Sequence, residues 1–89
     1  MKISDKKIQK IFEQILYYLY SINPKATYTS YIAEEIARDE EFVKKLLFEL
    51  KSKNLIIEIK KNKHGKDYSR RSRWKLSLET YNIYSNKQK

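Results

Sequence analysis

Apolar residues recur at helical spacing near the start of the chain, from about residue 5 to residue 22. Spacings of three and four residues place them on one face of a helix. That apolar stripe consists of Ile8, Ile11, Phe12, Ile15, Leu16, Leu19 and Ile22. Ser4 is placed to cap this helix, and Asn23-Pro24 ends it, because the residue before a proline avoids the helical region. The pattern predicts a long amphipathic first helix.

Two shorter helices are predicted between about residues 30 and 53, on either side of a short turn. The apolar positions of the first are Ile32, Ala33 and Ile36, and those of the second are Val43, Leu46, Leu47 and Leu50. Asp39 can cap the second helix, because its carboxylate can accept a hydrogen bond from a backbone amide of the first turn. Asn54 follows the last periodic position, where a left-handed residue ends a helix, and Leu55 supplies the apolar residue of a Schellman stop.

Alternating polarity replaces the helical period after the second short helix. A strand with one buried face is predicted from the alternation of Leu55, Ile57 and Ile59. Gly65, the only glycine of the chain, marks a hairpin tip. The inward side of the returning strand is expected to carry Trp74, Leu76 and Leu78. A short first strand is expected at residues 26–28, and a final helix capped by Ser77 is expected at about residues 78–85.

The stretch IAEEIARDEEFVKKLLFELKSKNLI, followed by a basic hairpin, resembles the winged-helix DNA-binding superfamily. The resemblance covers roughly residues 27–78 and is clearest with small transcription regulators of bacteria and archaea, including those of archaeal viruses and plasmids. It implies an α+β fold, a winged helix-turn-helix with a three-helix core, a hairpin wing over residues 55–78 and a short C-terminal helix. Residues 1–89 would form one domain, with residues 40–53 as the recognition helix.

Two positions depart from the family's pattern. The turn between the two short helices often reads Gly then an apolar residue, where this chain has Ala37 and Arg38. The residue after the recognition helix is often Gly, and here it is Asn54, which adopts the same left-handed conformation at some cost. The resemblance also implies that Ala33 lies where the two helices touch.

Positive charge is concentrated in the C-terminal part of the chain. Residues 1–50 contain eight Lys and Arg against eight Asp and Glu, whereas residues 51–89 contain twelve against three, which is the whole net charge of +9. Eight of the twelve lie between Lys60 and Lys75, on the predicted hairpin. Such a one-ended excess is typical of a surface that binds a polyanion. A solvated basic face that only keeps the protein soluble is the alternative.

The exposed face of the predicted recognition helix supplies candidate contacts to DNA. Lys44 and Lys45 can reach phosphates or the acceptor edge of guanine, and Ser52 can contact a phosphate. Glu41 can accept from cytosine N4, although stabilising the helix dipole and pairing with Lys45 are alternatives. An exposed Phe48 can touch thymine methyl groups, stack on a base or pack against the wing.

The full set of candidate DNA-binding residues adds the start of the first short helix and the cations of the hairpin. It consists of Ser30, Glu41, Lys44, Lys45, Phe48, Ser52, Lys61, Lys63, Lys66, Arg70, Arg71 and Arg73. The hairpin cations are expected to lie along the backbone or to enter a narrow minor groove. Trp74 is expected in the core or at the hinge of the wing, and His64 is interpreted as a turn residue.

No arrangement of residues points to catalysis or to a cofactor. The chain has no cysteine, no paired histidines and no Gly-rich phosphate loop, and its acidic residues lack metal-ligand spacing. We therefore expect no enzyme activity, no metal and no cofactor. No apolar run approaches the roughly 20 residues of a membrane span, and no signal peptide opens the chain. A cytoplasmic, nucleoid-associated protein without a membrane partner is expected.

Double-stranded DNA is the expected partner, and transcription regulation is the expected function. An architectural or RNA-binding winged helix is one alternative, and a protein–protein interaction module, which has no need of a basic hairpin, is another. Homodimerisation is expected through the first and last helices, because they carry more aromatic residues than one core face requires: Tyr17, Tyr20, Tyr81 and Tyr84. Packing around the monomer's own core is the alternative for such tyrosines. The many Ile, Lys and Glu are typical of thermophiles, although AT-rich genomes also favour Ile and Lys.

Overall fold

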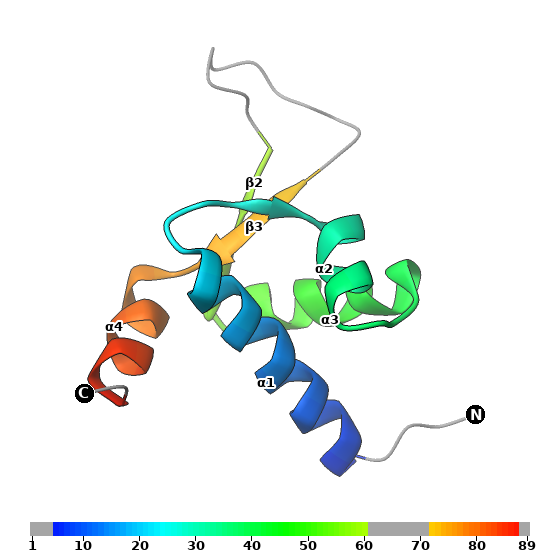
Figure 1. Ribbon diagram of the computed structural model, residues 1–89, viewed down its shortest axis with the longest axis horizontal. Coiled ribbons are helices and arrows are strands. Elements are labelled where there is room, and N and C mark those ends of the chain that lie inside the picture. The colour runs from blue at the N-terminus through cyan, green and yellow to red at the C-terminus, as the bar shows by residue number, and fades with distance from the viewer. Residues whose placement is uncertain (1–4, 61–71, 88–89) are drawn as a thin grey trace.

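The computed structural model describes residues 5–60 and 72–87, which contain four helices and a three-stranded sheet (Figure 1). In chain order the elements are α1 (Asp5–Ile22), β1 (Thr27–Tyr28), α2 (Thr29–Glu35), α3 (Glu40–Ser52), β2 (Ile56–Ile59), β3 (Arg73–Leu76) and α4 (Leu78–Lys87). This combination of helices and a small antiparallel sheet confirms the expected α+β class. Helix α1 has the bounds that its apolar stripe predicts, whereas α4 continues past the predicted end near residue 85.

The hydrophobic core lies between the helices and one face of the sheet. Helix α1 contacts α2 and β3, and α3 packs against α2 and β2. The apolar stripe predicted for α3 is buried in full. The buried apolar residues of the described segments are Ile11, Phe12, Ile15, Leu16, Leu19, Ile32, Ala33, Val43, Leu46, Leu47, Leu50, Ile56, Trp74 and Leu76.

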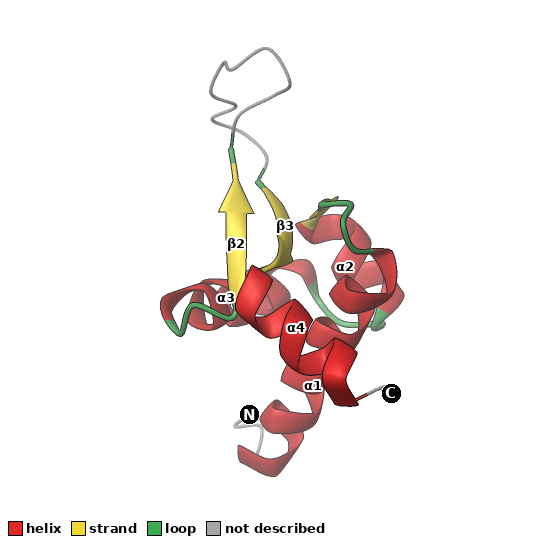
Figure 2. Ribbon diagram, turned by 90° about the vertical axis from the view of Figure 1, so that its left-hand side faces the viewer, coloured by secondary structure: helices red, strands yellow, loops and turns green. Residues whose placement is uncertain are grey.

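The sheet has the strand order β1–β3–β2, and both strand pairs are antiparallel. Residues directly opposite each other in antiparallel strands share a face. Ile56 lies opposite Leu76, and Glu58 lies opposite Trp74. These four side chains therefore share the face that looks onto the helices. Figure 2 shows β2 and β3 rising side by side from the helical layer.

Strand β2 buries the opposite face from the one that the alternation predicts. Ile56 is 1% exposed, whereas Ile57 is 44% exposed. The strand register decides this, because Ile56 pairs with the buried Leu76 and Ile57 pairs with Lys75. Four of the five residues from Leu55 to Ile59 are apolar, so the alternation alone does not select a face.

The inward position predicted for Leu78 is also wrong. Leu78 is 75% exposed, because it begins α4 and does not extend β3. The cap predicted for this helix is confirmed: Thr80 N donates a 3.2 Å hydrogen bond to Ser77 Oγ. Likewise Phe42 N donates a 3.1 Å hydrogen bond to Asp39 Oδ2 at the start of α3. The cap expected at Ser4 lies outside the described residues.

Helix α3 ends in the Schellman motif that the sequence predicts. Leu55 N donates to Leu50 O over 3.1 Å, and Asn54 N donates to Lys51 O over 2.9 Å. Asn54 takes the left-handed conformation, with φ at 61°. The backbone thereby leaves α3 and enters β2 within a few residues.

Helix α2 ends in the same motif with a less suitable residue. Arg38 N donates to Ala33 O over 3.0 Å, and Ala37 N donates to Glu34 O over 3.2 Å. Ala37 has a φ of 56°, the left-handed conformation that costs a residue with a Cβ about 1 to 2 kcal/mol. The turn thus keeps the geometry that glycine usually provides, with alanine in its place.

The aromatic residues of α1 and α4 pack against one another within the chain. The ring centroid of Tyr20 lies 5.6 Å from that of Tyr81 and 5.6 Å from that of Tyr84. Burial, with a smaller effect of the Glu13 charge, raises the pKa of Tyr84 above its usual value. Packing within the chain, which the sequence left as the alternative to a dimer contact, is therefore observed for these three partly buried tyrosines. Tyr17, in contrast, is 60% exposed.

Candidate nucleic-acid interface

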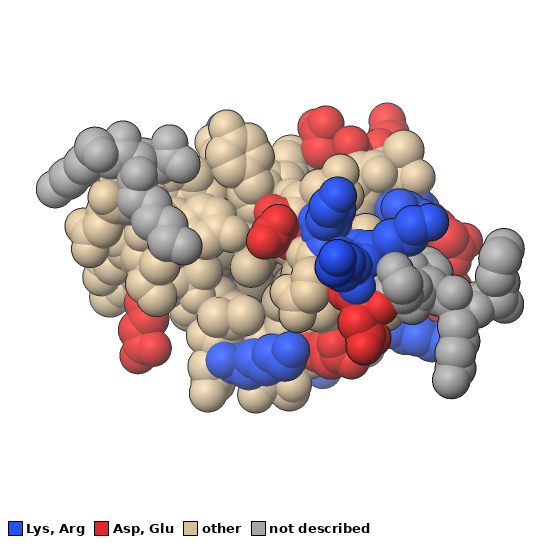
Figure 3. Space-filling model, turned by 90° about the horizontal axis from the view of Figure 1, so that it is seen from below, with Lys and Arg blue, Asp and Glu red and all other residues tan. Residues whose placement is uncertain are grey.

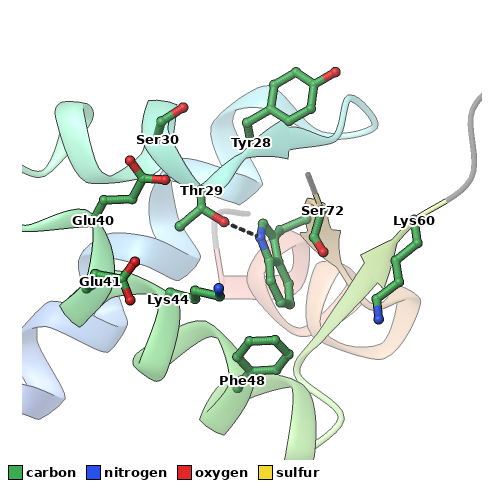
Figure 4. A pocket seen from close by; sticks show the side chains of 10 residues that line it. Tyr28, Thr29, Ser30, Glu40, Glu41, Lys44, Phe48, Lys60 and Ser72 are labelled. Carbon is green, nitrogen blue, oxygen red and sulfur yellow. Dashed lines mark hydrogen bonds between the residues drawn. The ribbon is translucent and has the colours of Figure 1, made fainter. Parts of the chain in front are cut away.

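A hollow of about 250 Å³ lies between the first turn of α2, the exposed face of α3 and the end of the sheet. Figure 4 shows side chains from all three regions converging on it. It is lined by Tyr28, Thr29, Ser30, Glu40, Glu41, Lys44, Phe48, Lys60, Ser72 and Trp74. The structure thus brings together four of the candidate DNA-binding residues: Ser30, Glu41, Lys44 and Phe48.

Two aromatic rings form the floor of this hollow. Trp74 is 1% exposed, and its Nε1 donates a 2.9 Å hydrogen bond to Thr29 Oγ1. The Phe48 ring meets Trp74 edge-on, with 5.5 Å between ring centroids. Trp74 is therefore a core residue, as predicted. Of the roles that the sequence left open for Phe48, packing against the base of the hairpin is the one observed.

A buried carboxylate lies beside the hollow, on the inner face of β2. The Glu58 side chain is 3% exposed, and its Oε1 accepts a 2.7 Å hydrogen bond from Lys51 Nζ. Its Oε2 accepts a further hydrogen bond from Ser72 Oγ. Burial raises the pKa of Glu58, but the hydrogen bonds from Lys51 and Ser72 and the charges of Lys51 and Lys60 together outweigh burial and lower it. Glu58 is therefore ionised at neutral pH.

The other candidates on described elements lie away from the hollow. Lys45 and Ser52 are exposed on α3 but do not line it. Ser52 Oγ donates a 2.6 Å hydrogen bond to Glu49 O, so its proton is used within its own helix. Arg73 is half-buried on β3, opposite Ile59 of β2. Five candidates and the histidine lie outside the described residues: Lys61, Lys63, Lys66, Arg70, Arg71 and His64.

The sequence did not indicate that Thr29, Lys60 and Ser72 belong to this site. They come from α2, the end of β2 and the start of β3, and no local spacing relates them. Thr29 and its partner Trp74, for example, are 45 residues apart. The sequence contained one indication for Lys60, its place at the start of the block of positive charge, but no relation to the other residues of the hollow. The positions of Thr29 and Ser72 depend on a strand register that only the folded sheet sets.

Charges of opposite sign line different parts of the hollow. Glu40 and Glu41 lie on the first turn of α3, whereas the ammonium groups of Lys44 and Lys60 point into the space between α3 and β2 (Figure 4). The lysines can donate to phosphate oxygens, and the glutamates can accept from the amino groups of bases. The arrangement fits a ligand that presents anions and hydrogen-bond donors side by side.

The underside of the molecule has a different charge distribution. Figure 3 shows positive and negative side chains intermixed towards one end of this face, and largely uncharged side chains over the remainder. The first turns of α1 place Lys6, Lys7 and Lys10 near Asp5 and Glu13, and all five are exposed. Mixed signs weaken the attraction of a polyanion. Both signs line the hollow as well, so its case as the candidate interface rests on the four candidate residues that it brings together.

No protein-family model and no curated protein matches this sequence, but solved structures share its architecture. The MepR–DNA complex of Staphylococcus aureus superposes with a TM-score of 0.72 at 22% identity, covering 94% of this chain. A ZitR variant of Lactococcus lactis gives 0.70 at 22% identity over 99% of this chain. PcaV of Streptomyces coelicolor, a transcriptional regulator in complex with its natural ligand, gives 0.66 at 14% identity over 93%. The fold is a winged helix-turn-helix.

Within this winged helix, α2 and α3 form the helix-turn-helix, and β2 and β3 are the strands of the wing. The chain spans 68%, 56% and 54% of the lengths of the MepR, ZitR and PcaV chains. Identities this low establish the fold and leave the function to be argued from the site. No helix in the described residues is long and apolar enough to cross a membrane.

Proposed function

We propose that this winged helix binds double-stranded DNA and regulates transcription, with residues 1–89 as one domain. The observation that carries the proposal is the distribution of charge along the chain: the whole net charge of +9 comes from residues 51–89. In helix-turn-helix proteins the recognition helix enters the major groove. A protein of this fold, MepR, has been solved with DNA. A DNA-bound regulator would be found with the nucleoid, in the cytoplasm.

In this proposal the first half of α3 enters the major groove. Lys44 and Lys45 are exposed there, and they would reach base edges and flanking phosphates. Lys60 would donate to the backbone from the other side of the hollow. Phe48 packs edge-on against Trp74 and is still 41% exposed, so its open side would touch thymine methyl groups or stack on a base. Glu41 would accept from a cytosine amino group or stabilise the start of α3.

The cations of the wing would supply most of the backbone contacts. Arg73, on the outer face of β3, would extend the row of positive charge begun by Lys60. Further contacts to phosphates or to a narrow minor groove would come from Lys61, Lys63, Lys66, Arg70 and Arg71. Such contacts position the protein on DNA without reading its sequence directly.

The proposal is tested by titrating the protein with a duplex, a single strand and a structured RNA, each at two salt concentrations. We expect the tightest binding to the duplex and weaker binding of every ligand at the higher salt concentration. A preference for RNA would favour the RNA-binding alternative. Failure to bind any of the three would leave a protein-interaction role.

A homodimer formed through α1 and α4 is part of the proposal. The contact would rest on Tyr17, Tyr20, Tyr81 and Tyr84. Tyr17 is 60% exposed and the other three are partly buried, and Leu78 and Ile83 of α4, 75% and 52% exposed, add apolar surface. Two recognition helices related by two-fold symmetry would read half-sites about 34 Å apart.

Sedimentation at micromolar protein concentration tests the dimer. A species with twice the chain mass of 10.8 kDa is expected. If only the 10.8 kDa species is found, the dimer is wrong, and a single short site replaces the expected palindrome.

A further inference from the structure

Glu58 is an acidic residue at an inward position of the sheet, where apolar residues are usual. It lies on the inner face of β2 and its side chain is 3% exposed. An apolar residue at an inward position is often as stabilising as a buried ion pair, or more so. A negative charge beside the positive wing also weakens the attraction of a polyanion. The position of Glu58 therefore calls for a different explanation.

The contacts of Glu58 connect α3 with both strands of the wing. Its carboxylate accepts from Lys51 on α3 at 2.7 Å and from Ser72, the residue immediately before β3. Lys51 Nζ lies 5.7 Å from the centroid of the Phe48 ring on the same helix. Phe48 in turn packs edge-on against Trp74 of β3.

Trp74 completes this series of contacts by donating to Thr29 at the start of α2. We name the six connected residues the stem network: Thr29, Phe48, Lys51, Glu58, Ser72 and Trp74. They join α2, α3, β2 and β3 around the floor of the hollow, and four of them line it. Glu58 is the member that bonds to the helix and to both strands at once, because it belongs to β2 itself.

We propose that Glu58 is a positioning residue, which fixes the wing strands relative to α3 so that the cations of both elements meet one DNA duplex together. The cations in question on the described residues are Lys44 and Lys45 on α3, and Lys60 and Arg73 on the wing strands. This proposal rests on the proposed DNA-binding function and adds a role that the function itself does not require. Glu58 would act through the elements that it connects and would not touch DNA.

The test compares Glu58→Ala with a control of equal charge, Glu49→Ala. Both variants remove one negative charge, so electrostatic attraction alone predicts equal or tighter DNA binding for both. Glu49 is an exposed residue of α3, the helix that carries Lys51, and lies outside the stem network. We expect Glu49→Ala to bind as well as the wild type or better, and Glu58→Ala to bind about tenfold more weakly, a loss of about 1.4 kcal/mol. Tighter binding by both variants would overturn the proposal.

The salt dependence separates a positioning role from a loss of folded protein. A smaller folded fraction weakens binding without changing the slope of log K against log salt, whereas a displaced wing loses phosphate contacts and flattens the slope by about one unit per contact. Glu58→Ala should flatten the slope. Glu58→Gln, whose amide oxygen can still accept from Lys51 and whose amide NH2 can donate to Ser72 Oγ, should recover most of it. A slope equal to that of the wild type in folded Glu58→Ala would contradict the proposal.

The two proposals fail in different ways. If the wild type does not bind duplex DNA, the proposed function is wrong and Glu58 has no duplex to position against. If the wild type binds and both the affinity and the slope survive in Glu58→Ala, DNA binding stands and the positioning role is wrong. If Glu58→Ala does not fold, as judged by circular dichroism, the slopes of log K against log salt are compared for Glu58→Gln and Ser72→Ala instead. The proposal then expects a flatter slope for the variant that loses the Ser72 bond.

Discussion

Aromatic rings join separate elements in two regions of this molecule. Between α1 and α4, Tyr20 packs against Tyr81 and Tyr84 at 5.6 Å. Between α3 and the sheet, Phe48 packs against Trp74 at 5.5 Å. The first contact adjoins a largely uncharged part of the surface (Figure 3), whereas the second forms the floor of a hollow lined by both acidic and basic side chains.

The difference teaches that an aromatic contact alone does not mark a functional site. Each contact fixes one element against another, and each removes apolar area from water. Only the α3 contact places charged groups of two elements around the same space, because Lys44 and Lys60 flank it. Substitutions in the α1–α4 region should therefore change stability, and substitutions around the hollow should change DNA binding.

The largest effect is expected for Tyr20→Ala. The substitution removes one ring from two aromatic contacts, and it should lower the free energy of unfolding by about 2 to 3 kcal/mol. Urea denaturation followed by circular dichroism measures this loss. Gln14→Ala is the control, because Gln14 is exposed on the same helix and lies outside the proposed dimer contact, and it should stay within about 0.5 kcal/mol of the wild type. A stability of Tyr20→Ala equal to that of the wild type would break the comparison.

Lys44→Ala should have the opposite effect: it should weaken DNA binding and leave the stability of the fold unchanged. Its stability should match that of the wild type, because Lys44 is exposed, whereas its affinity for the preferred duplex should fall by about 1 to 2 kcal/mol. The value lies in the lower part of the usual range for a base contact, because lysine is a single-point donor. Fluorescence anisotropy with a preferred and a random duplex measures both affinities. Equal losses on the two duplexes would assign Lys44 to the backbone and move base reading elsewhere.

Stability should depend on pH through Glu58. The pKa of Glu58 is lowered in the folded protein, so its contribution is present above the unfolded value of about 4.5 and is lost as pH falls through the folded value. Glu58→Gln does not titrate at this position. Urea denaturation at pH 7 and below pH 4.5 should therefore show a stability difference between wild type and Glu58→Gln that shrinks in acid. A difference that stays constant would mean that Glu58 is unpaired in solution.

The smallest effect is expected for the two helix-ending turns. Ala37→Gly should raise the free energy of unfolding by about 1 kcal/mol, because glycine adopts a left-handed φ without a Cβ clash. Asn54→Gly should change it by only a few tenths of a kcal/mol, since asparagine tolerates this conformation. Thermal unfolding of both variants gives the comparison. A greater increase in the free energy of unfolding for Asn54→Gly than for Ala37→Gly would show that the surroundings of Ala37 already compensate for its left-handed conformation.

Local signals in the sequence predicted much of this fold. Asp39, Ser77 and Asn54 each act within a few residues along the chain, so their roles as caps and stop were accessible without a structure. The apolar stripes of α1 and α3 were accessible for the same reason, because helical spacing itself selects the buried face. Exposure of Lys44 and Phe48 on α3 followed from the same periodicity.

Contacts between distant segments were not accessible in this way. The buried face of β2 depends on its register with Leu76, and an almost continuous apolar run hides that choice. Tyr20 belongs to a residue type that is enriched at interfaces. Only the position of α4 shows that its ring packs against Tyr81 and Tyr84 of the same chain. The bond of Glu58 to Lys51 joins two elements whose relative position no spacing encodes. These are the residues on which stability and the hollow depend.

The central claim, that the positive charge of this winged helix contacts DNA phosphates, is tested most directly by the salt dependence of wild-type binding to a duplex. If the wing and α3 neutralise about four to six phosphates per chain, log K should fall with log salt at a slope near −4 to −5. A slope near zero would mean that these residues form only a solvated face, and that result, like the absence of measurable binding, would contradict the proposed function.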